Sequence, residues 1–562
     1  MNVQQGHPLA GARANRWLTV CFALATAAYA TAAVIAMAIL SPRVPYADAW
    51  RHYARLLGTP FPGSVLKAEN GHPEVVANLV RLADLLWLRG DERWQIAVGI
   101  ALSLATFGVG LAAVLRAGVP PLARSAAACV LSLGIFWLGN ARALAHDNES
   151  LHVYSVLLCT FAALVLVLRQ DDRHAASSRR VVAAAALCFF ASFNFGSGLA
   201  SFIALFAVLF MQRARLRQLM IAGAGLALTL VCYHLLDGSG GVPIRLQPIS
   251  DAVLALRWIA SPLIYLVWPL VDPVAAAALP GPLGTLAGAA ARHWTEVFGE
   301  VRISVFPHVF FGGAFFVATL LATLRARAKP EAGDSIHRFG LALAWFGLGV
   351  AAMVAVSRSA YFVEYPAQVY APRYLPWPSL AWAGLLMAWA GRASAKRPAY
   401  AVALAVSIFA LAAEGGMSLV MLHQREVAED VALAAVVGVW PGENAIGEVN
   451  AADTRDGAYV LRREATGPFA WPEAEWVGRS VPAGAGERVG PGLVVTRQEG
   501  VSDEAALHVE ANGVGAACRQ RLLVVDRGRV VGLLRPLGGG RWRGVARAEV
   551  GAPLQLFELA CS

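Results

Sequence analysis

The chain has 562 residues, of which 57% are hydrophobic and only 15% are charged, and its mean hydropathy is +0.55. Soluble domains carry about 25% charged residues, so this composition excludes an ordinary soluble protein. The net charge of +10 does not indicate a nucleic-acid-binding protein either, because the arginines gather in short loops between apolar runs.

Apolar runs of about 17–25 residues recur along the chain and are long enough to cross a bilayer as helices. The first run, 17–40, has a basic start like that of a signal peptide. It is longer than a signal-peptide core of about 7–15 residues, and no small-residue cleavage site precedes Ser41. We therefore expect it to be a retained first transmembrane helix.

The basic loops orient the expected helices, because short loops rich in arginine and lysine stay in the cytoplasm. These loops lie at 13–16, 116–124, 169–180, 213–217, 325–329 and 392–397. The N-terminus is then cytoplasmic, and the segments 41–94, 140–152, 194–198 and 357–379 face the periplasm. The segment 252–302 holds either two helices or one long interfacial element. We expect about 11–13 transmembrane helices and a periplasmic C-terminus.

The composition changes at about residue 423, where charged residues become frequent. Short alternating runs such as "GLVVTRQ" and "ALHVEAN", separated by glycine-rich turns, predict a small β-rich domain. We therefore divide the chain into a transmembrane domain, 1–422, and a periplasmic β-rich domain, 423–562. Cys518 and Cys561 are a candidate disulfide, because the periplasm is oxidising. The other five cysteines lie in apolar runs, as small core residues do.

The first periplasmic loop, 41–94, is rich in polar side chains for so apolar a chain. It carries, in order, Asp48, Trp50, His52, Glu69, Asn70, His72 and Glu74, and the stretch 74–88 has one apolar side, typical of a helix on a membrane surface. Carboxylates there can act as a general base toward a hydroxyl, or bind a divalent ion that neutralises a phosphate leaving group. The alternative is a solvated loop whose charges pair among themselves.

The order of these features resembles that of the GT-C glycosyltransferases, which have an acidic residue just beyond the first helix, a long first external loop, many spans and a terminal external domain. "YADAW", then "ENGHPEVVANLVRLAD", then "APRYLPWPSLAW" is also similar to a group of uncharacterised bacterial membrane proteins. That group has an Asp-x-Trp element, an Asn-Glu-His-Arg-like element and a late Arg-Tyr.

Two departures from these patterns affect the expected site. In "ENGHP" the Asn and His of the second element remain, while its Glu and Arg are displaced or missing. GT-C enzymes often carry paired acids after the first helix, whereas "YADAW" has Asp48 alone, which leaves Glu69 or Glu74 as its partner.

The second periplasmic loop, "AHDNESLHVY", offers a further acidic site. Glu149 and His152 are three residues apart and would share one face of a helix. The competing interpretation, which we favour here, is a helix cap formed by Asp147 or Asn148. A metal site drawn from His52, His72 and His146 has no supporting spacing.

Arg373 and Tyr374 lie before a tryptophan-bearing helix at the expected outer interface. An arginine there can hold the phosphate of a carrier lipid with two parallel hydrogen bonds, and Arg358 is a second candidate. The alternative is interfacial anchoring within an aromatic belt, and the two roles are compatible.

The resemblance implies an inner-membrane glycosyltransferase of GT-C type. It would move a sugar by inversion from a polyprenyl-phosphate carrier to a glycan, lipid or protein acceptor at the periplasmic face, with membrane lipids around it and no nucleic-acid partner. The candidate catalytic residues are Asp48, as base or as ligand of an assisting divalent metal ion, with Glu69 and His72. The candidate substrate-binding residues are Trp50, Glu74, Glu149, Arg358, Arg373 and Tyr374.

No cofactor other than such a metal ion is expected. The alternative function is a non-enzymatic transporter or flippase of a lipid-linked glycan. We rank it second because transport sites place charges inside helices near the midplane, whereas almost all charges here lie at helix ends.

Overall fold

The structure is a computed structural model. It describes the chain except residues 1–7, 69–70, 169–175, 237–245, 278, 280, 302–303, 329–334, 391–396, 413, 441–450, 489–491, 498–505, 515–520, 550 and 560–562. The chain forms two compact units. Unit 1 comprises Met1–Ile39, Lys67–Ala77 and Val98–Met421, and unit 2 comprises Leu40–Leu66, Asn78–Ala97 and Leu422–Ser562.

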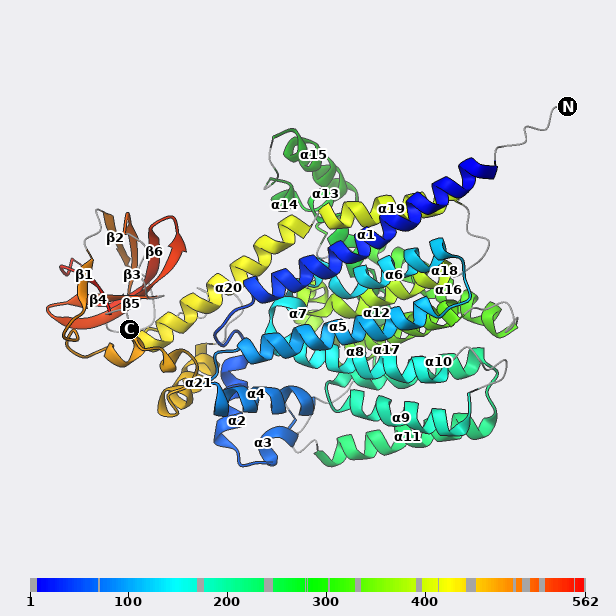
Figure 1. Ribbon diagram of the computed structural model, residues 1–562, viewed down its shortest axis with the longest axis horizontal. Coiled ribbons are helices and arrows are strands. Elements are labelled where there is room, and N and C mark those ends of the chain that lie inside the picture. The colour runs from blue at the N-terminus through cyan, green and yellow to red at the C-terminus, as the bar shows by residue number, and fades with distance from the viewer. Residues whose placement is uncertain are drawn as a thin grey trace. The chain divides into compact units, whose positions relative to one another are not determined.

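Unit 1 is helical (Figure 1). Its helices are α1 (Pro8–Leu40), α5 (Arg93–Leu115), α6 (Pro121–Phe136), α7 (Ala141–Ala145), α8 (Asp147–Val167), α9 (Ser178–Ser192), α10 (Ala200–Met211), α11 (Leu216–Leu236), α12 (Pro248–Leu266), α13 (Trp268–Val271), α14 (Pro273–Ala277), α15 (Gly281–Phe298), α16 (Phe306–Ala328), α17 (Ser335–Glu364), α18 (Pro376–Ala390) and α19 (Arg397–Ala412). Short 3-10 turns lie at η1 (Leu138–Asn140), η2 (Gly196–Leu199), η4 (Pro366–Tyr370) and η5 (Pro372–Tyr374).

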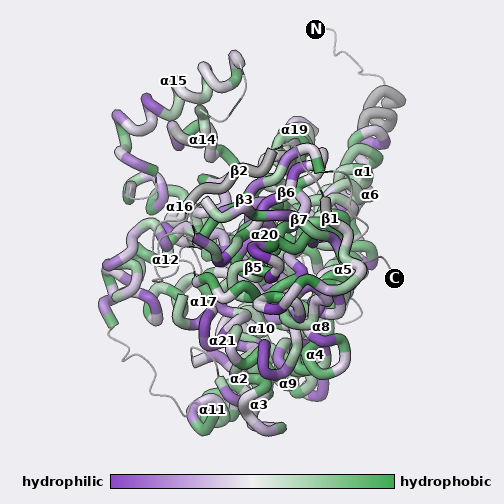
Figure 2. The backbone as a smooth tube through the Cα atoms, turned by 90° about the vertical axis from the view of Figure 1, so that its left-hand side faces the viewer, coloured by the Kyte–Doolittle hydropathy of each residue, from purple (hydrophilic) through white to green (hydrophobic). Residues whose placement is uncertain are grey.

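Within the described ranges, nine helices are long and apolar enough to cross a membrane. Figure 2 shows hydrophobic residues, in green, over much of the backbone. This agrees with the predicted polytopic helical architecture, and the total of 11–13 spans stays a prediction. The segment 252–302 was predicted to hold either two helices or one interfacial element. There, α12 is one of the nine helices among the described residues, and the shorter α13, α14 and α15 follow it.

Helices α17 and α18 pack closely through small residues. A Cβ atom on Gly340 would lie 2.3 Å from the Gly384 carbonyl oxygen, and one on Gly384 would lie 2.5 Å from the Gly340 carbonyl oxygen. Neither position has room for a larger side chain. Backbones approach in this way where small residues line helix interfaces in membrane proteins, because no hydrophobic effect drives helix association in lipid.

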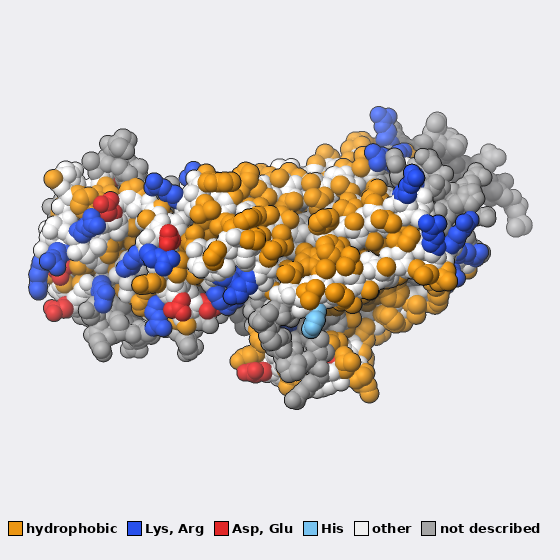
Figure 3. Space-filling view, turned by 90° about the horizontal axis from the view of Figure 1, so that it is seen from below, with side chains coloured by type: hydrophobic (Ala, Val, Ile, Leu, Met, Phe, Trp, Pro, Cys, Tyr) orange, Lys and Arg blue, Asp and Glu red, His pale blue; other side chains and the backbone are white. Residues whose placement is uncertain are grey.

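Several of the basic loops share one end of unit 1. Arg213 donates from Nε to the carbonyl oxygen of Arg327 at 2.9 Å and from Nη2 to that of Ala328 at 3.0 Å, which joins the ends of α10 and α16. Gln212 donates from Nε2 to the Val167 carbonyl at 3.0 Å, at the end of α8. In Figure 3 the apolar surface ends on one side in a group of Lys and Arg side chains. The cytoplasmic location of this end stays a prediction.

Unit 2 combines helices with an antiparallel sheet. The helices are α2 (Ala49–Gly58), α3 (Gly63–Leu66), α21 (Ala451–Arg463) and the later parts of α4 (Val75–Trp87) and α20 (Glu414–Val437). The strands are β1 (Gly486–Arg488), β2 (Gly492–Arg497), β3 (Ala506–Asn512), β4 (Leu522–Asp526), β5 (Arg529–Gly538), β6 (Arg541–Arg547) and β7 (Gln555–Glu558), in the order β1-β7-β4-β5-β6-β3-β2.

The predicted C-terminal sheet is therefore present, and it starts later than residue 423. α20, α21 and the 3-10 turns η6 (Gly467–Ala470) and η7 (Ala474–Trp476) precede it. Ion pairs fasten the sheet to α20: Arg535 Nε and Arg543 Nη2 each lie 2.7 Å from a carboxylate oxygen of Asp430. The predicted amphipathic stretch at 74–88 forms α4, on which Leu86 and Trp87 are exposed.

Candidate functional site

Segments that the sequence assigns to one membrane face meet in unit 1. The backbone N–H of Val75, in the first loop at the start of α4, donates to the Phe193 carbonyl at 2.9 Å. Ser379 Oγ donates to Asn140 Oδ1 at 3.1 Å, and η5 packs against α7. Parts of the first loop, the second loop, the turn before η2 and the loop before α18 thus gather at the same end of the helices.

A buried ion pair lies at the start of α8. Arg142 Nε donates to Glu149 Oε1 at 2.6 Å, and His146 Nδ1 is 3.5 Å from the same oxygen. The side chains of Arg142 and Glu149 are only 6% and 12% exposed. Glu149 is therefore an ionised carboxylate that holds Arg142, rather than a free base. The sharp turn between α7 and α8 makes the pair, because it brings residues seven apart face to face.

Two histidines flank the ring of Phe195 beside this ion pair. The His152 ring stacks on Phe195 with centroids 4.3 Å apart, and the His72 ring lies 4.9 Å from it. His152 Nδ1 is 3.9 Å from Glu74 Oε1, and Glu74 is buried. Gly196 makes room for His72, since a Cβ atom there would lie 2.5 Å from His72 Nδ1. A carboxylate beside an imidazole is an arrangement suited to moving a proton.

Arg373 lies against tyrosine and glutamine side chains. It donates from Nη2 to Tyr361 Oη and Gln368 Oε1, both at 3.2 Å, and its Cζ lies 5.1 Å from the centre of the Tyr374 ring. No described residue forms an ion pair with it. Its neighbours thus orient the guanidinium without neutralising it, which leaves the charge to attract an anion.

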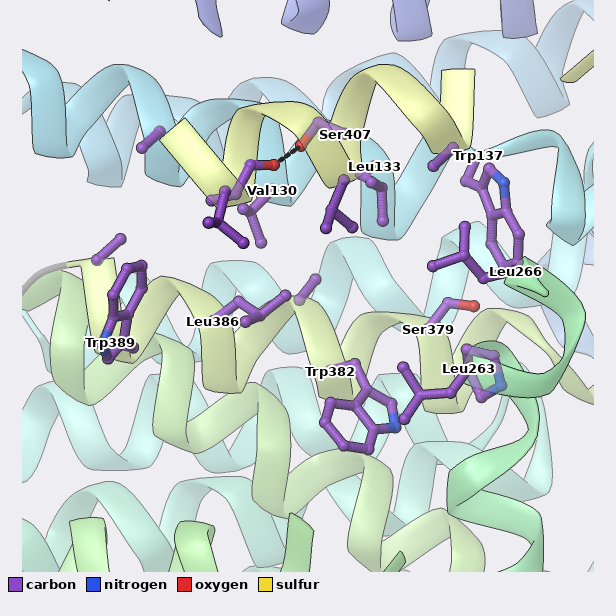
Figure 4. Close-up of a pocket in the computed structure, with 18 of the residues that line it drawn as sticks. Val130, Leu133, Trp137, Leu263, Leu266, Ser379, Trp382, Leu386, Trp389 and Ser407 are labelled. Atoms are coloured by element: carbon purple, nitrogen blue, oxygen red, sulfur yellow. Dashed lines mark hydrogen bonds between the residues drawn. The ribbon is translucent and has the colours of Figure 1, made fainter. Parts of the chain in front are cut away.

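An apolar cavity of about 630 Å³ lies between α6, α12, α18 and α19. Figure 4 shows Trp137, Leu266 and Ser379 at one end and Trp389 at the other. The Ser379 end is joined to Asn140, and η1 and η5 pack beside it. Trp137 is 3% exposed, and its indole N–H has no hydrogen-bond partner among the described residues. The cavity is within the size range of sites for drug-sized ligands.

Asp48 and Trp50 belong to unit 2, where they lie at the start of α2. The Asp48 side chain is 56% exposed, and one of its oxygens is 3.6 Å from Arg51 Nη2. Arg51 also lies 2.7 Å from Asp453 on α21. Trp50 is fully buried in a core formed with α20 and α21, and a Cβ atom on Gly457 would lie 2.5 Å from its carbonyl oxygen. Packing therefore fixes α2, while the Asp48 carboxylate stays accessible.

Several other predicted site residues lie outside the described residues or apart from these contacts. Glu69, Asn70, Cys518 and Cys561 lie outside the described residues, so the disulfide stays a prediction. Arg358 is half-buried on α17 and forms no ion pair with a described residue. His146 occupies the N-cap of α8 without a side-chain capping bond, and the side chains of Asp147 and Asn148 lie outside the description. Among the described residues, no three His, Cys, Asp or Glu side chains gather in a way that suits a metal ion.

Two residues that contact predicted site residues were not among the predictions. They are Arg142, which pairs with Glu149, and Phe195, which lies between His72 and His152. Arg142 had a usable signal, because an arginine just after an apolar run is costly unless it has a partner, and Glu149 is one of the carboxylates that follow in the same loop. Phe195 had none, since its role depends on the packing of η2 against α8. Comparisons of the chain with protein-family models, with curated proteins and with solved structures found no match.

Proposed function

We propose that the protein is a membrane glycosyltransferase of GT-C type that takes a sugar from a polyprenyl-phosphate carrier. The observation that carries the proposal is Arg373, an oriented guanidinium with no acidic partner among the described residues. It lies on η5, which packs against α7 and α18 where the apolar cavity ends. An anion site beside an apolar cavity suits a lipid with a phosphate headgroup.

The proposed transfer needs a group that holds the carrier phosphate and a base that accepts a proton. The carrier phosphate would accept hydrogen bonds from Arg373 as the bond between the sugar and the phosphate breaks, since the leaving group gains negative charge there. A carboxylate would take the proton of the acceptor hydroxyl as its oxygen attacks the sugar carbon. Asp48, exposed in unit 2, and Glu74, beside His152 in unit 1, are the two candidate bases. The carrier chain would occupy the cavity.

Replacing Arg373 by glutamine tests the anion site. Arg373→Gln should weaken binding of a polyprenyl phosphate at least tenfold, because a charge-assisted pair of hydrogen bonds is worth about 1.5–3 kcal/mol. Binding is measured by native mass spectrometry of the detergent-solubilised protein. Arg327→Gln is the control, because Arg327 lies in the last turn of α16, where its Nη1 donates to the Phe210 carbonyl at 2.8 Å, and this variant should bind nearly as the unaltered protein does. Equal loss in both variants would remove Arg373 from its proposed role.

A second prediction concerns the cavity. Ala403 lines it, and Ala403→Phe should reduce binding of polyprenyl phosphate by filling part of the space that the chain needs. Ile408, on the same helix, is 53% exposed and does not line the cavity, so Ile408→Phe is the control. Comparing long-chain and short-chain polyprenyl phosphates separates binding of the chain in the cavity from binding of the phosphate at Arg373. Ala403→Phe should weaken binding of the long-chain lipid only. If it weakened binding of neither lipid, the carrier chain would lie outside this cavity.

The flippase is the second candidate function, and the same variants separate it from the transferase. If purified protein moves a lipid-linked glycan between leaflets of proteoliposomes while Asp48→Asn and Glu74→Gln both leave cellular glycosylation intact, the transporter replaces the enzyme. Loss of transfer in either variant supports the enzyme.

A further inference from the structure

Arg257 is a charged residue inside a helix that is long and apolar enough to cross a membrane. It is the tenth residue of α12 and is half-buried. Its Nε donates to Tyr370 Oη at 3.1 Å, and its Cζ lies 5.6 Å from the centre of the Tyr370 ring. Ionisable residues in such positions are expensive and usually functional, because a charge in hydrocarbon needs a partner.

The surroundings of Arg257 do not neutralise it. No described residue forms an ion pair with it, and its buried Nη2 has no hydrogen-bond partner among the described residues. Burial raises the pKa of Tyr370 to about 12, so the phenol stays neutral and only orients the guanidinium. Tyr265 in turn donates from its hydroxyl to the Tyr370 carbonyl at 2.5 Å, which holds η4 against α12.

His308 approaches the same tyrosine from α16. It is fully buried, and its ring centre lies 4.6 Å from that of Tyr370. Its Nδ1 is 3.3 Å from Ser304 Oγ, while its Nε2 has no hydrogen-bond partner among the described residues. His308 also lies in the first turn of a helix of 23 residues, where exposed N–H groups add partial positive charge.

The two helices are held together closely enough to keep these groups in place. Gly312, one turn beyond His308, faces the backbone of Leu256, and a Cβ atom there would lie 2.0 Å from the Leu256 carbonyl oxygen. Arg257 and His308 therefore lie on neighbouring helices beside the same buried Tyr370 ring, and each has a nitrogen with no hydrogen-bond partner among the described residues. This arrangement is distinct from Arg373, whose hydrogen bonds go to Tyr361 and Gln368.

We propose that Arg257 and His308, positioned by Tyr370, bind a phosphate-type oxyanion at a second site. A phosphate accepts hydrogen bonds from both a guanidinium and an imidazole N–H. It also supplies the counter-charge that no described residue gives to Arg257. Its source is either a lipid headgroup or a soluble phosphate. The inference does not depend on the transferase, because it concerns binding alone.

The test uses the full-length protein in two settings. Inorganic phosphate is titrated into protein in neutral phosphatidylcholine nanodiscs and followed by phosphorus NMR line broadening. Separately, native mass spectrometry measures how much phosphatidylglycerol the protein retains from mixed nanodiscs. Arg257→Gln and His308→Gln should each lower binding at least tenfold in one of the two settings, and that setting identifies the source. Tyr370→Phe should give a smaller loss, since it removes the hydroxyl that orients Arg257 and keeps the ring.

Two controls distinguish binding from a structural role. His337 is also buried, but its Nδ1 is 2.6 Å from the Ala388 carbonyl, so His337→Gln should leave phosphate binding unchanged. Without ligand, Arg257→Gln should melt at the same temperature as the unaltered protein or higher, because it removes a charge that no described residue neutralises. Unchanged binding in both settings for Arg257→Gln and Tyr370→Phe would overturn the proposal, and so would a lower melting temperature of Arg257→Gln with unchanged binding.

Discussion

Asp48→Asn should lower the proposed glycosyl transfer by about 10²–10⁴-fold, the loss typical of a missing general base. Asparagine keeps the size and shape of the side chain and removes its basicity. Asp48 is 56% exposed and pairs with Arg51 at 3.6 Å. An exposed ion pair contributes about 0–1 kcal/mol to stability, so the protein should fold normally and still bind the carrier. Transfer is measured by the amount of glycan product in cells and carrier binding by native mass spectrometry.

Asp453→Asn is the matched control for Asp48→Asn. Asp453 contacts Arg51 at 2.7 Å, so its replacement disturbs the same arginine without touching the candidate base. It should leave transfer within a fewfold of normal. Comparable losses in both variants would assign the effect to Arg51 and not to base catalysis. If Asp48→Asn is active and Glu74→Gln is not, the base is Glu74, beside His152 in unit 1.

Arg142→Gln should destabilise the protein by about 3–5 kcal/mol, and so should Glu149→Gln. Each change leaves the other member of a buried ion pair without its counter-charge, which costs much more than an exposed pair is worth. Their side chains are 6% and 12% exposed, and the two atoms lie 2.6 Å apart. Stability is measured by thermal unfolding of the protein in one detergent. The doubly substituted protein should be more stable than either single variant, because no charge is then buried alone.

An exposed pair serves as the comparison for this experiment. Arg463 Nε lies 2.8 Å from Glu464 Oε1, with side chains 57% and 42% exposed, so Arg463→Gln should cost less than about 1 kcal/mol. If the double variant lost as much stability as the two single variants together, Arg142 and Glu149 would act independently. The ion pair would then not organise the second loop.

Hydropathy alone predicted the helical membrane class, because each spanning helix satisfies its own backbone hydrogen bonds and its apolar residues are consecutive in the chain. The C-terminal sheet was predictable for a similar reason: alternation along a strand is local. Its starting point was not, since the charged residues of α20 and α21 read as the start of the new domain. Those helices pack against α2 and the sheet, and contacts of that kind leave no local pattern.

The candidate site shows where local reasoning stops. The spacing of Glu149 and His152 predicted a shared helix face, yet Glu149 pairs with Arg142 and His152 lies near Glu74. A spacing of three residues tells which side chains are neighbours on a helix, not which partner each one meets. The meeting of His72 with Phe195, more than a hundred residues later, follows only from the packing of separate helices.

A chain of apolar helices with basic loops and a C-terminal sheet could be predicted without the structure, because composition, charge bias and alternation are properties of neighbouring residues. The tertiary structure alone decided which polar groups are compensated. Arg142 finds a carboxylate, whereas Arg373 and Arg257 are held by tyrosine hydroxyls without one among the described residues. Whether a charge is neutralised depends on atoms within a few ångströms of it, and distant segments of the chain supply those atoms only after folding.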